Sequence, residues 1–275
     1  MALNFEVQWI HGAADCERST DPLLQTHAAD ETTVIFRQSK CSSFEAPFMY
    51  LLIGTSRSLL VDTGAPIDGD DVLPMRATVD AILARHAGAA HELVVAHSHA
   101  HGDHAAWDRQ FDGRSRTAVV PMRREDIQAR FGIDRWPDGK GTLDLGGRVL
   151  TVLPIPGHEA HHIAIHDSRT KLLLTGDTLY PGLLVANDWR AYRLSARRLQ
   201  AFASRVGISC ALGAHVEMAR SGALFPLGST FQPDEHPLQL SAEDLTRWAD
   251  ACDRLGENPP RRQHAFRSFV IDVRG

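Results

Sequence analysis

The sequence has few lysines, no long apolar run and no strongly basic segment, and each shortage excludes a class of protein. Lys40, Lys140 and Lys171 are its only lysines, and the formal net charge is −5 at pH 7. The sequence has no basic run that could bind a phosphate backbone, so we expect no nucleic-acid partner. No stretch reaches the roughly 18 apolar residues of a membrane-spanning helix. The start, residues 1 to 21, is too polar for a signal peptide. We therefore expect a cytoplasmic protein with a small-molecule substrate and no membrane partner; a homodimer stays open.

Cysteine is scarce and widely spaced. Cys16, Cys41, Cys210 and Cys252 form no Cys-x-x-Cys pair. This spacing argues against a disulfide framework and against a thiolate zinc site, so we expect four reduced cysteines with structural roles. A Gly-x-Ser-x-Gly turn is also missing, which leaves no obvious serine nucleophile for acyl-enzyme chemistry.

The chain does have enough apolar residues for a real core. Its 275 residues are 43% hydrophobic, and this length fits one large domain, with two smaller ones as the alternative. Strand and helix patterns alternate along it, so we expect an α/β (α+β) fold formed as a single domain over residues 1–275.

A histidine-rich segment stands directly after one predicted strand. The apolar run at 93–96 reads as a buried strand, and residues 97–104 follow with the sequence HSHAHGDH. His99 and His101 alternate, so both rings project to one side of an extended segment. Asp103 and His104 are adjacent and point apart, which suits a second ion. Imidazole and carboxylate are ligands of zinc, with iron or manganese also possible. His97 falls outside this register, and we expect it to be a hydrogen-bonded core group or to support a ligand by hydrogen bonding.

The pattern His-x-His-x-Asp-His starting at His99 resembles the metallo-β-lactamase superfamily of hydrolases. Further motifs follow in the family's order: Pro-Gly-His-Glu around His158, Thr-Gly-Asp-Thr around Asp177 and Gly-Ala-His ending at His215. The resemblance covers about residues 48 to 216 and implies a four-layer αββα sandwich. It also implies two Zn²⁺ ions per chain. The first would be held by His99, His101 and His158, the second by Asp103, His104 and His215, with Asp177 bridging them.

The same resemblance implies roles for the Asp103 carboxyl group and the Tyr180 phenol. A metal-bridging hydroxide would attack an ester, lactone or thioester of a small substrate, and Asp103 would protonate the leaving group. Tyr180, three residues after Asp177, matches a family lactonase residue that donates a hydrogen bond to the substrate carbonyl; a packed core aromatic is an equal alternative. Asp62 could be a ligand, but a buried helix or turn cap, or an acceptor for a ligand histidine, is the favoured interpretation.

Other functions remain open at this stage. A mononuclear iron sulfur dioxygenase-like oxidoreductase would use part of the same ligand set. A β-lactam hydrolase fits less well, because the family's true lactamases are exported and do not use an aspartate bridge at position 177. A glyoxalase-II-like thioesterase shares the Gly-Asp-Thr-Leu pattern but would need more helix than remains after residue 240. A non-catalytic metal-binding scaffold is disfavoured by the complete ligand set.

The remaining expectations concern elements around this site. We expect a helix that is capped by Asp70 or Asp71, ends at Gly88 and carries an apolar stripe of Val72, Met75, Val79, Ile82 and Leu83. Further helices are expected over 105–111, 122–131, 195–206 and about 241–255, the last with a capping-box-like start at Ser241 and Asp244. Two hairpins are expected, over 47–61 and 163–174. The loop at about 216–240, with Trp189 and Tyr192, is predicted to form an apolar wall over a pocket. Trp136 lies either near a pocket or against the core. Predicted strands cover 33–36, 47–53, 58–61, 117–120, 142–145, 148–153, 163–166, 171–174, 208–212 and 265–273, the last as an edge strand. His161, His162 and His166 are expected on a solvent face.

Overall fold

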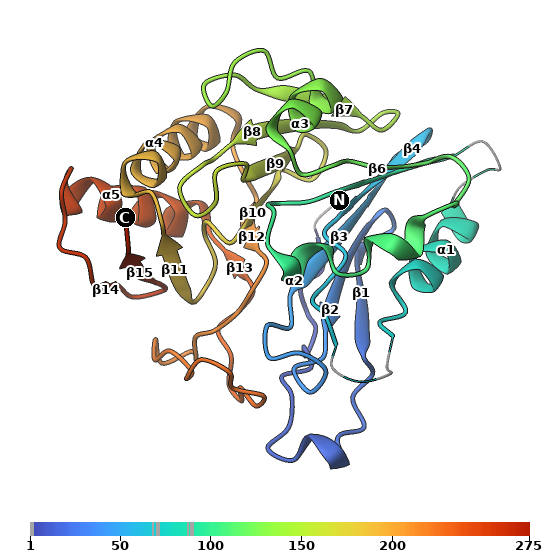
Figure 1. Cartoon of the computed structure of the whole chain (residues 1–275), viewed down its shortest axis with the longest axis horizontal. Coiled ribbons are helices and arrows are strands. Elements are labelled where there is room, and N and C mark those ends of the chain that lie inside the picture. The colour runs from blue at the N-terminus through green and yellow to red at the C-terminus, as the bar shows by residue number, and fades with distance from the viewer. Residues whose placement is uncertain (1–2, 68, 70–71, 87, 89–90) are drawn as a thin grey trace. The chain divides into compact units, whose positions relative to one another are not determined.

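The computed structural model describes residues 3–67, 69, 72–86, 88 and 91–275 (Figure 1). It divides into two compact units, each assembled from separate stretches of the chain. The first comprises Met1–Met122, Asp144–Val149 and Pro226–Pro233. The second comprises Arg123–Leu143, Leu150–Phe225 and Asp234–Gly275. The expectation of a single domain stays a prediction.

The first unit contains a six-stranded mixed sheet whose strand order follows the sequence. The strands are β1 (Leu24–Asp30), β2 (Thr33–Gln38), β3 (Phe48–Ile53), β4 (Arg57–Val61), β5 (Glu92–Ala96) and β6 (Thr117–Val119). Strands β1 to β4 pair antiparallel, and β4, β5 and β6 pair parallel. The hairpin expected over 47–61 is confirmed as β3 and β4. The chain before β2 adds β1, which the sequence pattern does not predict.

Helix α1 (Met75–His86) packs its apolar stripe on this sheet. Met75, Val79, Ile82 and Leu83 recur at helical spacing and are all buried, which is the pattern of a helix with one face on a core. Val72 was expected on the same stripe, but it precedes the helix and is 58% exposed. The expected caps, Asp70 and Asp71, lie outside the described residues.

The second unit contains another six-stranded sheet, in the order β13-β12-β10-β9-β8-β7. Its strands are β7 (Gly141–Asp144), β8 (Val149–Pro154), β9 (Ile163–Asp167), β10 (Leu172–Gly176), β12 (Cys210–Gly213) and β13 (Gln239–Leu240). The hairpin expected around 163–174 is confirmed as the antiparallel pair β9 and β10. Strand β10 pairs parallel with β12, so their carboxyl ends lie at the same edge.

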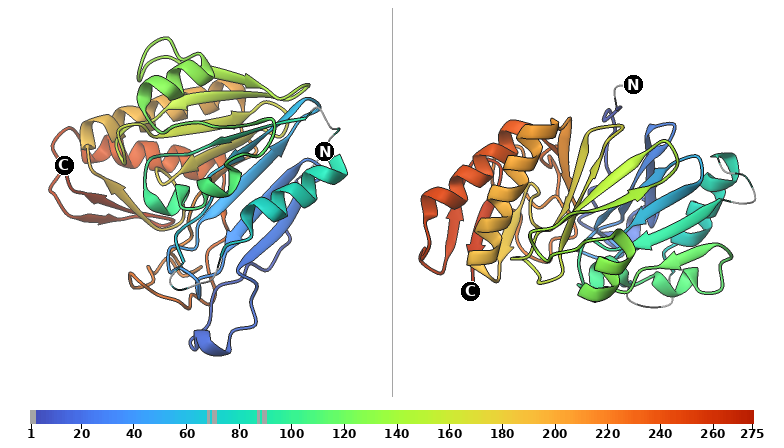
Figure 2. Two further views of the ribbon diagram at one scale, coloured as in Figure 1. Left: turned by 45° about the vertical axis from the view of Figure 1, so that its right-hand side comes forward. Right: turned by 90° about the horizontal axis from the view of Figure 1, so that it is seen from above.

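Three helices belong to the second unit: α3 (Arg124–Phe131), α4 (Trp189–Val206) and α5 (Ala242–Leu255). Helices α4 and α5 lie side by side (Figures 1 and 2). The expected capping box at the start of α5 is confirmed, with Ser241 and Asp244 bonded to each other's backbone. Helix α4 begins at Trp189, six residues before the expected Ser195, because the Asp188 side chain accepts from Ala191 N and caps it there.

Two expectations for the second half are wrong. Strand β15 (Val270–Val273) is the central strand of a small sheet between β11 (Leu183–Ala186) and β14 (Gln263–Ala265), not an edge strand. Trp189 and Tyr192 do not form a pocket entrance: they are 4% and 0% exposed and pack in the core with Trp248. The Tyr192 hydroxyl donates to Thr178 O at 2.6 Å, which fixes the ring inside.

The cysteine expectation is half wrong. Cys16, in the short 3₁₀ helix Cys16–Arg18, forms a disulfide with Cys41. The two Cα atoms lie 5.2 Å apart across 25 residues of sequence, a distance that a disulfide readily spans. Sequence spacing carries no signal for such a pair, because the fold and not the chain brings them together. Cys210 and Cys252 are free and buried, as expected.

Candidate metal centre

Strand β5 ends at Ala96, and the next eight residues carry the predicted ligands of the first unit. His99 and His104 are buried at 2% and 0% exposure, and His101 and Asp103 are half-buried. The short helix α2 (Gly102–Ala105) presents Asp103 and His104. His99 Nε2 lies 2.9 Å from His101 Nδ1, so the alternating pair does project to one side. His104 Nε2 lies 3.1 Å from Asp103 Oδ2.

Asp62, directly after β4, contacts two residues of the histidine-rich segment, Ser98 and His104. Its Oδ1 accepts from Ser98 N at 2.7 Å and its Oδ2 from Ser98 Oγ at 2.9 Å. The same Oδ2 lies 2.9 Å from His104 Nδ1. A carboxylate at Nδ1 favours the proton there, which leaves the Nε2 lone pair for a metal. Asp62 thus contacts His104, as one interpretation of its role expects, while the role of His104 as a ligand stays a prediction.

His97 belongs to a different network. Its Nε2 lies 2.9 Å from Asp108 Oδ1, which also accepts from Thr63 Oγ1 at 2.9 Å. Asp108 begins the 3₁₀ helix η2 (Asp108–Phe111). His97 therefore links the end of β5 to η2, as expected for a buried, hydrogen-bonded core group.

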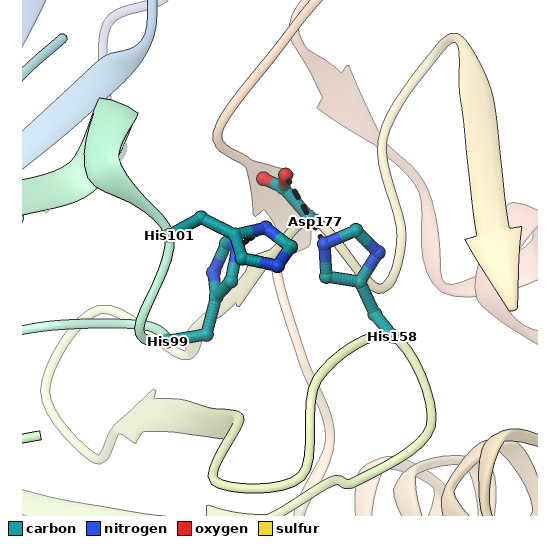
Figure 3. A group of neighbouring side chains, drawn as sticks. All are labelled: His99, His101, His158 and Asp177. Carbon is teal, nitrogen blue, oxygen red and sulfur yellow. Dashed lines mark hydrogen bonds and ion pairs between the residues drawn. The ribbon is translucent and has the colours of Figure 1, made fainter. Parts of the chain in front are cut away.

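The second unit places one carboxylate between two imidazoles. Asp177 follows β10, and its Oδ2 lies 3.6 Å from His158 Nε2 while its Oδ1 lies 3.3 Å from His215 Nε2. His158 and Asp177 are joined by a dashed line in Figure 3. All three side chains are buried. His215 follows β12, the parallel neighbour of β10, so adjacent strand ends deliver Asp177 and His215.

His158 is held in one orientation by backbone contacts. Its Nδ1 lies 3.0 Å from Val185 O, which favours the tautomer with a free Nε2 lone pair. Gly157, immediately before it, has φ +140°, and a Cβ there would lie 2.3 Å from Tyr192 Cα. Only glycine fits this close approach of the loop to α4, which explains the Pro-Gly-His order.

Two sets of described side chains each offer ligand atoms within 4.8 Å of one another. One set is His99, His101, His158 and Asp177, drawn in Figure 3, and the other is Asp103, His104, Asp177 and His215. All seven residues that the resemblance implies belong to these two sets, and Asp177 is common to both. Imidazole with carboxylate is a suitable donor set for zinc, and the supported Nε2 atoms fit that use. Their roles as ligands stay predictions.

Tyr180 lies beside His215, with ring centroids 5.5 Å apart in an edge-to-face arrangement. Its hydroxyl donates to Leu183 O at 2.7 Å or Glu217 Oε2 at 3.0 Å, and the same Glu217 oxygen accepts from Leu183 N. Burial first, and then the Glu217 and Asp177 carboxylates, raise the pKa of Tyr180 well above its ordinary value. Its role as a substrate donor stays a prediction.

Glu217 is the residue in this network that the sequence motifs do not reveal. It stands two residues after His215 in an apolar stretch. Its position between Val216 and Met218, both buried, could have indicated a role in a hydrogen-bond network. A carboxylate in apolar surroundings needs a hydrogen-bond partner.

The three histidines between the second unit's motifs do not share a solvent face. His162 and His166 are 0% and 3% exposed, and His161 is half-buried beside Trp136. His162 Nδ1 lies 3.1 Å from Thr178 Oγ1. The expectation is wrong for His166 because every residue of β9 is buried, so this strand has no solvent face. His162 stands directly before β9 and is buried as well.

A comparison with family models finds the metallo-beta-lactamase superfamily over residues 43–250. The chain belongs to the metallo-beta-lactamase superfamily. It is a metallo-hydrolase, and the α/β fold class expected from the sequence is confirmed. Solved metallo-beta-lactamases from Hirschia baltica and Pontibacter korlensis match with TM-scores of 0.55 and 0.52. They are 13% and 16% identical over 84% and 83% of this chain, and 98% of each of theirs is covered.

Two curated relatives are named as enzymes that hydrolyse thioesters. The acyl-coenzyme A thioesterase MBLAC2 of Gallus gallus is 26% identical over 218 residues, covering 66% of this chain and 77% of that protein. A hydroxyacylglutathione hydrolase of Hyphomonas neptunium is 27% identical over 145 residues, 52% of this chain and 54% of that protein. In the part of the chain that the structure describes, no helix combines the length and apolarity needed to cross a bilayer.

Proposed function

We propose that this protein is a dinuclear zinc hydrolase that cleaves a thioester, ester or lactone of a small substrate, with a thioester as the favoured bond. The observation that carries the proposal is Asp177, whose two oxygens face different histidines, His158 and His215. A carboxylate placed in this way suits two ions that share it. The names of the MBLAC2 and hydroxyacylglutathione hydrolase relatives support the choice of a thioester.

Different residues of the chain would bind the metals, orient the ligands and donate a proton. Bound divalent cations lower the pKa of water and polarise a carbonyl group, which is the chemistry that the seven side chains would recruit. Asp62 and Val185 O orient His104 and His158 before any substrate arrives. Asp103 has a side chain that is 19% exposed, beside His104, so it can hand a proton to the departing thiolate or alkoxide.

The test is a hydrolysis panel on protein that has been stripped with a chelator and reloaded with zinc. It contains coenzyme A thioesters, a γ-lactone, an aryl ester and a β-lactam. We expect hydrolysis of the thioesters to disappear on stripping and to return with zinc. Activity that survives stripping, or hydrolysis confined to the β-lactam, contradicts the proposal. One iron per chain in the protein as purified would favour the sulfur dioxygenase-like alternative.

Partners and location also stay proposals. We propose a small-molecule substrate with no nucleic-acid or membrane partner, as the charge pattern suggests. The assembly state, with a homodimer open, and the cytoplasmic location stay predictions. The Cys16–Cys41 disulfide weighs against the cytoplasm, because disulfides persist mainly in oxidising compartments.

A further inference from the structure

A cavity of about 480 Å³ opens in the second unit next to His158. Trp136, Pro137, Pro156, His158, Ala160 and Ala191 contribute to its wall. The volume lies within the roughly 300 to 1,000 Å³ of small-molecule pockets. Trp136 comes from the loop after α3, and Ala191 from the first turn of α4.

The polar side chains around this cavity already have partners. Asp188 Oδ1 accepts from Ala191 N at 3.0 Å, Asn187 Nδ2 donates to His158 O at 2.8 Å, and Glu159 Oε2 accepts from His161 N at 2.7 Å. The exposed Arg124 lies over the Trp136 ring, 5.9 Å from its centroid. A ligand inside would therefore meet rings and small aliphatic groups more than free donors or acceptors.

His158 connects the cavity to the candidate metal centre. It lines the cavity, and its Nε2 faces Asp177. A substrate whose scissile carbonyl lies at the centre can thus place one of its two halves in the cavity. A coenzyme-type thiol half carries amides and several phosphates. Most of these would lose their water there without gaining partners, because Arg124 is the one Lys or Arg side chain among the described residues that line the cavity. A hydrocarbon acyl half loses nothing on entering and gains from burial.

We propose that this cavity receives the aliphatic acyl group of the substrate, and that Trp136 and Ala191 set the acyl length the enzyme prefers. The inference rests on the proposed function. Trp136 supplies a broad apolar surface, and the small side chains of Ala160 and Ala191 leave the space open.

The test compares acyl length with activity and with binding. Zinc-loaded protein is assayed with N-acetylcysteamine thioesters from acetyl to decanoyl. We expect kcat/KM to rise about fourfold per methylene until the cavity is full, as expected for burial of a CH₂ group. Ala191→Phe should flatten this rise. Ala160→Phe is a second blocking variant in a loop, and exposed Ala201→Phe on the same helix is the matched control.

Binding of the decanoyl thioester to metal-free protein, measured by calorimetry, tests the acyl pocket separately from the proposed hydrolase function. Weaker decanoyl binding in Ala191→Phe and Ala160→Phe, with wild-type binding in Ala201→Phe, supports the acyl pocket even if no substrate is hydrolysed. Thioester hydrolysis that does not depend on acyl length overturns the pocket while the proposed function stands. A length profile that both blocking variants share with wild type overturns it too.

Discussion

Tyr180 can act as a hydrogen-bond donor to the substrate or as a packed core aromatic, and a single substitution distinguishes the two roles. Burial and Glu217 keep its hydroxyl protonated, so it remains a hydrogen-bond donor. If it donates to the substrate carbonyl as charge develops, Tyr180→Phe should lower kcat about ten- to a hundredfold with KM and metal content unchanged. Two metals that already polarise the carbonyl would make the loss smaller than for a sole donor.

Tyr192→Phe is the matched control, since it also deletes a buried hydroxyl, in that case one bonded to Thr178 O. Wild-type kcat in Tyr180→Phe, with a lowered melting temperature, would assign Tyr180 to the Glu217 network alone. That outcome would remove the residue-level support for a lactonase-like mechanism.

His166 should make the protein sensitive to mild acid. Burial first, and then Lys171, lower its pKa below the ordinary 6.5. The unfolded chain therefore binds a proton more readily, so stability is lost as pH falls below about 6.5 toward the folded-state pKa. In His166→Gln, the urea midpoint should fall less between pH 7.5 and 5.5 than in wild type. Exposed His86→Gln is the control, and equal falls in wild type and His166→Gln would contradict the assignment.

At the residue scale, the ligands can be predicted from sequence because their spacing is local. The four candidate ligands from His99 to His104 lie within six residues, whereas the contact of Asp62 with His104 depends on the fold. His162 and His166 cannot be placed in this way. Burial of His166 depends on what covers both faces of β9, and burial of His162 depends on what packs around the residue before that strand; no local pattern reports either.

At the scale of elements, the disulfide ties the 3₁₀ helix η1 (Cys16–Arg18) to the loop after β2. Closing a loop of 25 residues should contribute about 3 to 4 kcal/mol to the free energy of unfolding, on the chain-entropy account. We expect reductant to lower the denaturation midpoint accordingly. The Cys16→Ser/Cys41→Ser double variant should start lower and be insensitive to reductant. Four free thiols in unreduced, denatured protein would show that the bond does not form.

Local signals and long-range pairing explain which elements are predictable. The start of α5 is visible in the sequence because Ser241 and Asp244 carry their capping signal within four residues. Strand β11 is not, because its four residues become a strand by pairing with β15, more than 80 residues later. Strand β1 has only a weak alternation and forms against β2. Elements stabilised by distant partners leave little trace in their own sequence.

At the scale of the whole molecule, the order of the motifs along the chain is enough to indicate the superfamily. The fold class can therefore be predicted from the sequence, whereas the division into two compact units built from interleaved segments cannot. Sequence order does not report that Asp144–Val149 and Pro226–Pro233 belong with the first unit.

The central claim is that one carboxylate, Asp177, holds two ions in place, and metal content tests it most directly. Elemental analysis of zinc-loaded wild type should give two equivalents of zinc per chain. Asp177→Ala should retain well under two and lose thioester hydrolysis, because both histidines lose the oxygen that faces them. Exposed Asp144→Ala, the control, should match wild type. Two full equivalents of zinc in Asp177→Ala would contradict the account.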